Sequence, residues 1–337
     1  MGKGCKRSFP GFPSPHLRRK TCSFSAVFWA LLPAPMSAAA EKISTLADLA
    51  AWSFAGVALA VVGRPVAHSL SPTIHNAALA ELAKTQPRFS DWRYFKFDID
   101  PAVLPRALTL FHQAGFHGLN LTVPHKALAV PQLTASDAFV QAAGAANTLS
   151  RTETGWGGAN TDGYGLSAAL RQDLGLELAG ANVVLIGAGG AARAAAVECL
   201  RQNCASLWIG NRTQATLTAL LSNLQPLAGE TTLHGFDLSM PPSRLPTGAC
   251  VLNATSLGLQ PGDLSPINLA KIPRPALVYD MIYRPARTAL LRQAAELGVT
   301  CANGLSMLVH QGARALEMWT GTKVPVDVMH QAALAAV

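Results

Sequence analysis

One segment, residues 182–193, limits the possible folds of this chain more than any other. Residues 182–186 are mostly apolar and β-branched, which predicts a strand buried on both faces. A turn with three glycines follows, and the alanine-rich run to Leu200 has high helix propensity. A strand, a glycine-rich turn and a helix form the first half of a dinucleotide-binding βαβ unit. The segment therefore predicts an α/β fold with a nucleotide site at this turn.

The small residues of this turn have distinct expected roles. Gly187 would allow the tight turn, Gly189 would let the backbone approach a pyrophosphate, and Ala192 would permit close packing of helix and strand. The pyrophosphate would bind free N–H groups at the helix N-terminus, where the helix dipole favours negative charge. Tight turns also need glycine where no ligand binds, so the rest of the chain must support this interpretation.

The residues after the next predicted strand indicate which dinucleotide binds. Residues 206–210 form this strand, which ends at Asn211, Arg212 and Thr213. In a classical NAD site, an Asp or Glu at about this distance after the glycine-rich turn binds the ribose 2′-hydroxyl. This chain has Arg212 instead, and a guanidinium binds the 2′-phosphate that a carboxylate would repel. The sequence therefore predicts NADP rather than NAD.

Length and charge set further limits. A chain of 337 residues is long enough for two domains, and its hydrophobic fraction of 50% supports a sizeable core. The net charge of +8 does not indicate a nucleic-acid partner, because six of the positive charges precede residue 21 and the remainder carries about +2. The six cysteines form no C-x-x-C pair and have no histidine at metal spacing. We expect a reducing compartment and no metal.

The first forty residues resemble a targeting segment. Basic residues precede an apolar run at residues 24–32 and small residues at 37–40, as in a secretory signal or a transit peptide. The run is too short to span a bilayer, and Pro33 and Pro35 interrupt it. We favour a basic, disordered extension over residues 1–42, with Met36 as the functional start, and a cytoplasmic protein.

The segment before the nucleotide unit has its own pattern. A helix is expected from residue 43 to 52, and strands are expected at residues 57–62, 94–98 and 118–123, alternating with helices. This alternation predicts a parallel sheet that binds ligands at the carboxyl ends of its strands. Ser69 and Ser71 lie at a helix start, with Ser71 as the expected N-cap before Pro72. Their hydroxyls and the free N–H groups suit a carboxylate, although a capped helix alone would explain them equally well.

Two charged residues follow in positions suited to catalysis. Lys126 lies just after the strand at residues 118–123, and a further helix is expected from there to about Ala143. Residues 157–163 form a glycine-rich segment that opens a helix from Tyr164. Asp162 lies at this helix start, where N-capping is the alternative to a catalytic role. Later strands are expected at residues 249–253 and 276–281 and near Val299, with helices at 287–297 and 306–319.

Nine separated motifs together resemble the shikimate dehydrogenase family, the NADP-dependent reductases of 3-dehydroshikimate. The similarity runs from residue 57 to the C-terminal helix. The motifs are G-R-P-V-A-H-S-L-S-P-T-I-H-N at Gly63, N-L-T-V-P-H-K at Asn120, G-A-A-N-T at Gly144, N-T-D-G at Asn160, G-A-G-G-A-A-R at Gly187, N-R-T at Asn211, N-A-T-S-L-G at Asn253, Y-D-M-I-Y at Tyr279 and G-L-S-M-L-V-H-Q at Gly304.

The resemblance implies two domains with a cleft between them. Residues 43–161 and 306–337 would form a three-layer α/β/α substrate-binding catalytic domain, and residues 162–305 a Rossmann NADP-binding domain. The C-terminal helix would return to the first domain. The expected partner is a small-molecule substrate, with neither nucleic acid nor membrane, and a homodimer is left open.

The resemblance also implies roles for individual residues. Ser69 and Ser71 would bind the substrate carboxylate. Lys126 would be the principal acid/base and Asp162 its partner, and which of this couple passes the proton is left open. The substrate hydroxyls and reacting oxygen would be bound by Thr122, Lys126, Asn147 and Asp162, with Tyr283 and Gln311 closing the pocket. NADP would contact Gly187, Ala188, Gly189, Gly190 and Ala191 at its pyrophosphate, Asn211, Arg212 and Thr213 at its 2′-phosphorylated ribose, and Met281 and Gly304 at its nicotinamide.

Two alternatives remain at this point. One is an NAD-dependent quinate/shikimate dehydrogenase, against which Arg212 and the paired serines argue. The other is a non-catalytic protein of the same fold that binds NADP or a metabolite. A binding protein has little need of a proton donor, so the presence of both Lys126 and Asp162 favours an enzyme.

Overall fold

The computed structural model describes Met1, residues 42–242 and residues 244–337. The extension expected over residues 1–42, including Met36, lies outside the described residues except at its two ends. Within the described ranges, no helix combines the length and the apolar character that a membrane span requires.

The first half of the chain forms a seven-stranded sheet with the order β1-β3-β2-β4-β6-β7-β5. Its strands are parallel except for β6, which runs antiparallel to both β4 and β7. The strands are β1 (Ile43–Ser44), β2 (Val57–Gly63), β3 (Trp92–Asp98), β4 (Gly118–Leu121), β5 (Ala135–Ser136), β6 (Thr148–Arg151) and β7 (Trp156–Ala159).

The second half forms a six-stranded, fully parallel sheet with the order β10-β9-β8-β11-β12-β13. Its strand order changes direction at β8, next to which the glycine-rich turn lies. The strands are β8 (Asn182–Ile186), β9 (Ser206–Asn211), β10 (Thr232–Asp237), β11 (Cys250–Asn253), β12 (Leu277–Asp280) and β13 (Thr300–Asn303). The two sheets confirm the predicted α/β class.

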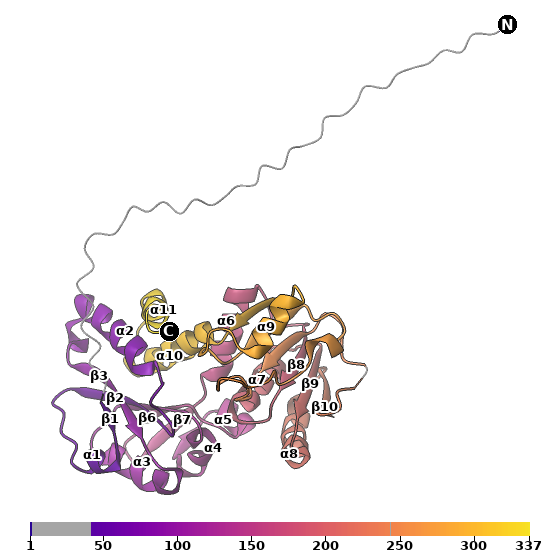
Figure 1. Cartoon of the computed structure of the whole chain (residues 1–337). Coiled ribbons are helices and arrows are strands. Elements are labelled where there is room, and N and C mark those ends of the chain that lie inside the picture. The colour runs from indigo at the N-terminus through magenta and orange to yellow at the C-terminus, as the bar shows by residue number, and fades with distance from the viewer. Residues whose placement is uncertain (2–41, 243) are drawn as a thin grey trace. The chain divides into compact units, whose positions relative to one another are not determined.

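Helices connect and cover these strands (Figure 1). They are α1 (Leu46–Ala50), α2 (Ser71–Thr85), α3 (Leu104–Gln113), α4 (His125–Leu128), α5 (Ala138–Ala143), α6 (Asp162–Leu174), α7 (Gly190–Arg201), α8 (Gln214–Leu224), α9 (Ala289–Glu296), α10 (Leu305–Thr320) and α11 (Val326–Leu334). Short 3₁₀ turns complete several connections.

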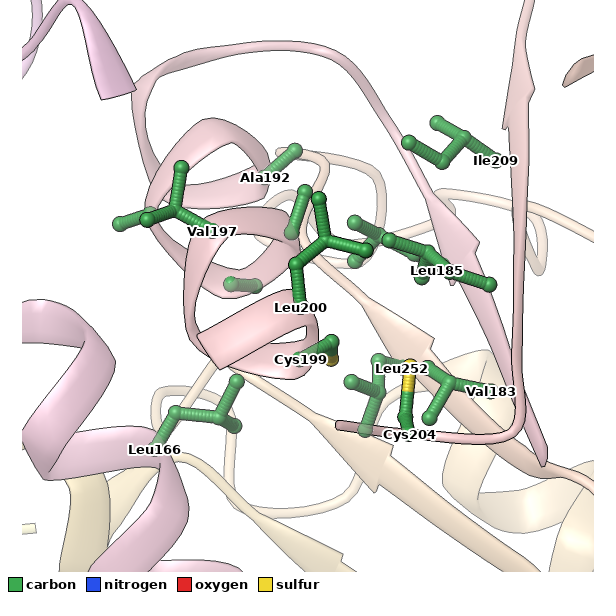
Figure 2. Packing of buried hydrophobic residues seen from close by; sticks show 14 of the residues in the cluster. Leu166, Val183, Leu185, Ala192, Val197, Cys199, Leu200, Cys204, Ile209 and Leu252 are labelled. Atoms are coloured by element: carbon green, nitrogen blue, oxygen red, sulfur yellow. The ribbon is translucent and has the colours of Figure 1, made fainter. Parts of the chain in front are cut away.

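The alanine-rich helix α7 packs against one face of the second sheet. Ala192, Ala195 and Ala196 are almost fully buried there, and such small side chains allow a close approach of helix and strand. In Figure 2, Leu200 of α7 points toward Leu185 of β8 within the same cluster of buried side chains. The predicted close packing at Ala192 is therefore present.

The last two helices pack against the first sheet, as the resemblance implied (Figure 1). Met307, near the start of α10, belongs to the core of the second sheet, whereas Val309 and Trp319 belong to a core shared with α2. The Trp319 indole N–H donates to the Leu149 carbonyl of β6 at 3.0 Å. The indole also lies where a side chain on Gly118 of β4 would be, so only glycine fits at that position. Helix α10 thus joins the two cores.

Two expected segments differ in the structure. Residues 43–52 form β1 and then α1, because Thr45 and Asp48 make a capping box that starts the helix at Leu46. The helix expected from Lys126 to Ala143 is divided into α4, a 3₁₀ turn at Val130–Gln132, β5 and α5. Pro131 lies in that turn, where it provides no N–H for a continuous helix.

The first sheet also contains a hairpin that the sequence pattern did not predict. Strands β6 and β7 pair antiparallel, although residues 157–163 read as a glycine-rich loop. Gly158 has a packing role in this hairpin, because a side chain there would collide with Leu133. Strand β10 was not predicted either, since three of its six residues are exposed and its apolar alternation is weak.

A buried histidine makes the stability of this core sensitive to acid. His75 of α2 is fully buried, its Nδ1 lies 2.7 Å from the Ser71 carbonyl, and its ring stacks on Tyr94. Burial lowers the pKa of His75 from 6.5 to about 4, an effect that hydrogen bonds to the backbone only partly oppose. The unfolded chain therefore takes up a proton between pH 6.5 and 4 that the folded chain does not.

We expect the free energy of unfolding to fall by about 3 kcal/mol through this one group as the pH drops from 7 to 4. In His75→Asn, which keeps a donor for the Ser71 carbonyl, this contribution is absent, so the variant should lose less stability on acidification. Urea unfolding of both proteins at pH 7 and pH 4.5 measures the difference. Equal losses in the two proteins would contradict the assignment.

Candidate active site

A buried ion pair joins the beginning of α4 to the beginning of α6. The Nζ atom of Lys126 donates to Oδ2 of Asp162 at 2.6 Å. The side chains are only 17% and 5% exposed, so water screens their attraction weakly. The two residues that the sequence singled out for acid/base chemistry are thus in direct contact, although they lie 36 positions apart.

Asn147 holds the second carboxylate oxygen of this pair. Its Oδ1 accepts the backbone N–H of Thr161 at 2.8 Å, which fixes the orientation of the side-chain amide. The Nδ2 atom therefore faces Asp162 and donates to Oδ1 at 2.8 Å. Asn147 is only 1% exposed, and these hydrogen bonds satisfy both ends of its buried amide within the protein. With Lys126 on one oxygen and Asn147 on the other, the carboxylate of Asp162 has a fixed orientation.

The N-cap role considered for Asp162 is wrong. Helix α6 begins at Asp162 itself, with Thr161 at the cap position, and the Asp162 carboxylate binds Lys126 and Asn147 instead of the helix backbone. The backbone N–H of Asp162 donates to the side chain of Asn160 at 2.9 Å, and that side chain donates in turn to the Ala145 carbonyl at 2.9 Å. The negative charge therefore lies in the first turn of α6, where the helix dipole stabilises it.

Gln311 of α10 reaches the same cluster. Its Nε2 donates to the Leu308 carbonyl at 2.9 Å, which turns Oε1 toward Asn147. Nδ2 of Asn147 then lies 3.2 Å from this oxygen. Gln311 and Asn147 are thus direct neighbours, although they lie 164 positions apart in the sequence.

The two serines lie at the beginning of α2, close to Tyr283. Ser71 is the first residue of the helix rather than its N-cap, and the Ser69 hydroxyl accepts the Ser71 N–H at 3.3 Å. Ser71 is 6% exposed. Burial raises the pKa of Tyr283, while a hydrogen bond from the Leu70 backbone acts in the opposite direction. This hydrogen bond brings Tyr283, which follows β12, next to the serine loop.

Thr122 lies at the end of β4, four residues before Lys126. Its backbone N–H donates to the Val62 carbonyl at 2.9 Å. Its methyl group occupies the place where a side chain on Gly63 would be, so glycine is required at the end of β2. The carboxyl ends of β2 and β4 therefore meet beside the loop that carries Ser69.

The glycine-rich turn has the geometry of a phosphate loop. Gly187 has a φ of +112°, which only glycine adopts readily. No atom lies within 4 Å of the place where a side chain on Gly189 would be, so the backbone is accessible at the N-cap of α7. A side chain on Gly190 would lie 3.8 Å from Lys126, which places the turn next to the ion pair. Ala188 is buried and Ala191 half-buried beside them.

The remaining predicted cofactor residues lie at strand ends of the second sheet. Asn211 ends β9, and its Nδ2 donates to the Thr213 carbonyl at 3.0 Å. Arg212 and Thr213 are exposed, so both are accessible to a ligand. Met281 and Gly304 are neighbours after β12 and β13, because a side chain on Gly304 would collide with the Met281 carbonyl.

Two buried polar residues at the ends of β11 and β12 were not predicted from the sequence, and they order the loops that follow these strands. Asn253 and Asp280 end the neighbouring strands β11 and β12 in register, and the Asn253 amide donates to Asp280 at 2.9 Å. The Thr288 hydroxyl donates to the other oxygen of Asp280 at 2.6 Å. Burial raises the pKa of Asp280, and these hydrogen bonds lower it. The signal in the sequence is two polar residues that end adjacent apolar strands.

Asn120 and Tyr94 were also missed. The Tyr94 hydroxyl donates to Oδ1 of Asn120 at 2.7 Å, and the Asn120 amide donates to the carbonyl of Asn147 at 3.1 Å. These bonds hold the backbone of Asn147 in place, so β3 and β4 contribute to the arrangement around Asp162.

Among the described residues, no group of three or more His, Cys, Asp or Glu side chains could hold a metal ion.

Two family descriptions match the chain. Residues 61–149 match the shikimate dehydrogenase substrate binding domain, and residues 304–334 match the shikimate 5′-dehydrogenase C-terminal domain. The shikimate dehydrogenase (NADP(+)) of Geobacter metallireducens is 37% identical over 82% of this chain and 96% of its own length.

Solved structures agree with this match. The shikimate 5-dehydrogenase of Thermus thermophilus, in complex with NADP(H) and shikimate, has a TM-score of 0.73 and 34% identity, covering 83% of this chain and 100% of that one. A 5-ketofructose reductase of a Gluconobacter species has a TM-score of 0.74 and 30% identity, covering 85% and 100%. The chain belongs to the shikimate dehydrogenase family, because it is similar in sequence to the Geobacter enzyme along nearly the whole of that protein.

Proposed function

We propose that this chain catalyses the reversible NADPH-linked reduction of 3-dehydroshikimate to shikimate, a step in the formation of chorismate and the aromatic amino acids. The observation that carries this proposal is the buried contact between Lys126 and Asp162 beside the glycine-rich turn. Curated relatives named shikimate dehydrogenase (NADP(+)) and the Thermus structure with NADP(H) and shikimate support it.

The glycine-rich turn fits the pyrophosphate of NADP. The open space at Gly189, the positive φ of Gly187 and the N-terminus of the 12-residue helix α7 suit a bound phosphate. The exposed guanidinium of Arg212, with Asn211 and Thr213, would bind the 2′-phosphate of the adenosine ribose. Gly187, Ala188, Gly189, Gly190 and Ala191 would contact the pyrophosphate, and Met281 and Gly304 would line the nicotinamide side.

The acid/base chemistry follows from the ion pair. When bound, NADPH supplies a hydride to the ketone carbon. Negative charge then develops on the ketone oxygen, and the ammonium of Lys126 polarises this oxygen and donates a proton to it. Asp162 orients the ammonium and balances its charge, while Asn147 keeps the carboxylate in position. Because Lys126 and Asp162 are in contact, they titrate as a couple.

The remaining site residues would bind and enclose the substrate. The hydroxyls of Ser69 and Ser71 and the free N–H groups at the beginning of α2 would bind the carboxylate. Thr122, Asn147 and Asp162 would hydrogen-bond the ring hydroxyls, and Tyr283 and Gln311 would close the pocket. Since a 5-ketofructose reductase shares the fold, the choice of a carboxylate substrate rests on the two serines rather than on the fold.

The domain division belongs to the same proposal. Residues 43–161 with 306–337 would form the substrate domain, and residues 162–305 the cofactor domain, with a basic extension at residues 1–42. The strands of the first sheet end at Ala159 and those of the second begin at Asn182, which supports a boundary between them. We also propose a cytoplasmic enzyme that acts on a small-molecule substrate as a homodimer.

Lys126→Ala should remove the proton donor while leaving intact the serine loop that would bind the substrate carboxylate. We expect kcat for shikimate oxidation with NADP⁺ to fall roughly 10²–10⁴-fold, with substrate still bound. A spectrophotometric assay of NADPH formation measures kcat and KM for both proteins. Lys84→Ala is the control, because Lys84 is an exposed lysine paired with Glu81 on α2, and its kcat should not change. Turnover that survives Lys126→Ala would show that the acid/base assignment is wrong.

Arg212→Ala tests the cofactor and separates the proposed function from an NAD-dependent quinate dehydrogenase. Loss of the guanidinium should raise KM for NADP⁺ by roughly tenfold and leave KM for NAD⁺ nearly unchanged. Initial rates with shikimate and with quinate measure both constants, and Arg106→Ala, an exposed arginine of α3, is the control. Equal changes for the two cofactors would argue against a 2′-phosphate site. A wild-type preference for quinate with NAD⁺ would overturn the choice of substrate.

A further inference from the structure

Helices α6 and α10 touch backbone to backbone at one point, and a glycine makes this contact possible. A side chain on Gly165 would lie 2.7 Å from Cβ of Gln311 and 2.9 Å from both the Gln311 nitrogen and the Met307 carbonyl oxygen. These distances are shorter than van der Waals contact, and two of the three atoms belong to the backbone of α10. Any larger residue at this position would therefore push the two helices apart.

Nothing in α6 itself calls for glycine here. Gly165 is the fourth residue of a 13-residue helix, and it is not one of the glycines with a positive φ. Glycine inside a helix is less favourable than alanine, because it loses more backbone entropy on folding. The reason for glycine at this position must therefore lie in the contact with α10.

Helix α10 is also closely packed where it meets α2. A side chain on Gly312 would lie 3.0 Å from Cε1 of His75 and 3.3 Å from Cδ1 of Ile74, both on α2. Helix α10 thus packs closely against α6 at Gly165 and against α2 at Gly312, so both neighbours limit where it can lie.

This contact determines where the Gln311 carboxamide lies. Its Nε2 donates to the Leu308 carbonyl of the same helix, so the carboxamide moves together with α10 as long as this bond is kept. Oε1 lies 3.2 Å from Nδ2 of Asn147, and the same nitrogen donates to Asp162 at 2.8 Å. A displacement of α10 by several tenths of an ångström would lengthen the first bond beyond hydrogen-bond distance.

We propose that Gly165 is a positioning residue for the reaction, which acts by setting Gln311 of α10 against Asn147 and thereby helps to orient Asp162. This inference rests on the proposed function, since it concerns how the same site is assembled. Gly165 touches neither substrate nor cofactor, so its contribution passes through Gln311.

The test is Gly165→Ala, assayed for shikimate oxidation with NADP⁺. We expect kcat/KM for shikimate to fall by about tenfold or more, because displacements below 1 Å at a positioned group already slow catalysis strongly. KM for NADP⁺ should stay within about twofold, because the glycine-rich turn is not involved. The gain in helix propensity offsets part of the strain, so the variant should fold.

Two further variants separate positioning from general damage. Ala169→Val overpacks a fully buried position of α6 one turn further along, and it should lower the melting temperature while leaving kcat/KM for shikimate nearly unchanged. In a Gln311→Ala background the carboxamide is already absent, so Gly165→Ala should then lower kcat/KM by less than about twofold. The same tenfold loss in both backgrounds, or an equal loss from Ala169→Val, would overturn the proposal.

A crystal structure of Gly165→Ala tests the inference without turnover. It should show the distance between Asn147 Nδ2 and Gln311 Oε1 lengthened beyond about 3.5 Å, and an unchanged distance would overturn the proposal. If the wild-type enzyme did not oxidise shikimate, the proposed function would fail, and this structure would still decide whether Gly165 sets the position of Gln311.

Discussion

The buried contact between Lys126 and Asp162 is the interaction on which the rest of the site depends. Both charges are largely removed from water, and such a pair is stable only when each group has further polar partners. Asn147 provides one for the carboxylate, and its own amide orientation is fixed by the Thr161 backbone. Tyr94 and Asn120 then hold the carbonyl of Asn147. A single ion pair thus accounts for several polar residues that would otherwise have no reason to be buried.

The fold brings these residues together because three chain segments, which are distant in sequence, meet at the ion pair of Lys126 and Asp162. Helix α4 follows β4 and carries Lys126, helix α6 follows β7 and carries Asp162, and α10 returns from the second sheet to add Gln311. The glycine-rich turn after β8 belongs to the other sheet, yet a side chain on its Gly190 would lie in van der Waals contact with Lys126. With the proposed roles, a proton donor from one sheet would face a phosphate-binding turn from the other, as reduction by a nicotinamide cofactor requires.

The sequence predicted the parts of the fold that depend on local pattern. Buried strands such as β2 and β8, and the turn at Gly187, follow from apolar runs and glycine. It failed where distant contacts decide: strand β7 has glycine at position 158 because Leu133 fills the space beside it. The local pattern left N-capping open as an alternative role for Asp162, because its partner Lys126 is remote in sequence. The joint role of Asn253 and Asp280 appears only once β11 and β12 are paired. Gln311 had no local signal and came from family resemblance alone.

If Lys126 delivers a proton to the oxygen that is reduced, with Asp162 and Asn147 holding the ammonium in place, Nζ must lie within hydrogen-bond reach of that oxygen in the substrate complex. A crystal structure of the complex with shikimate and NADP⁺ tests this most directly, through the distance from Lys126 Nζ to the oxygen on the carbon that exchanges the hydride. We expect a distance of about 2.6–3.2 Å with the contact to Asp162 retained. An oxygen bound by another donor, with Lys126 Nζ beyond hydrogen-bond reach and no bridging water, would contradict it.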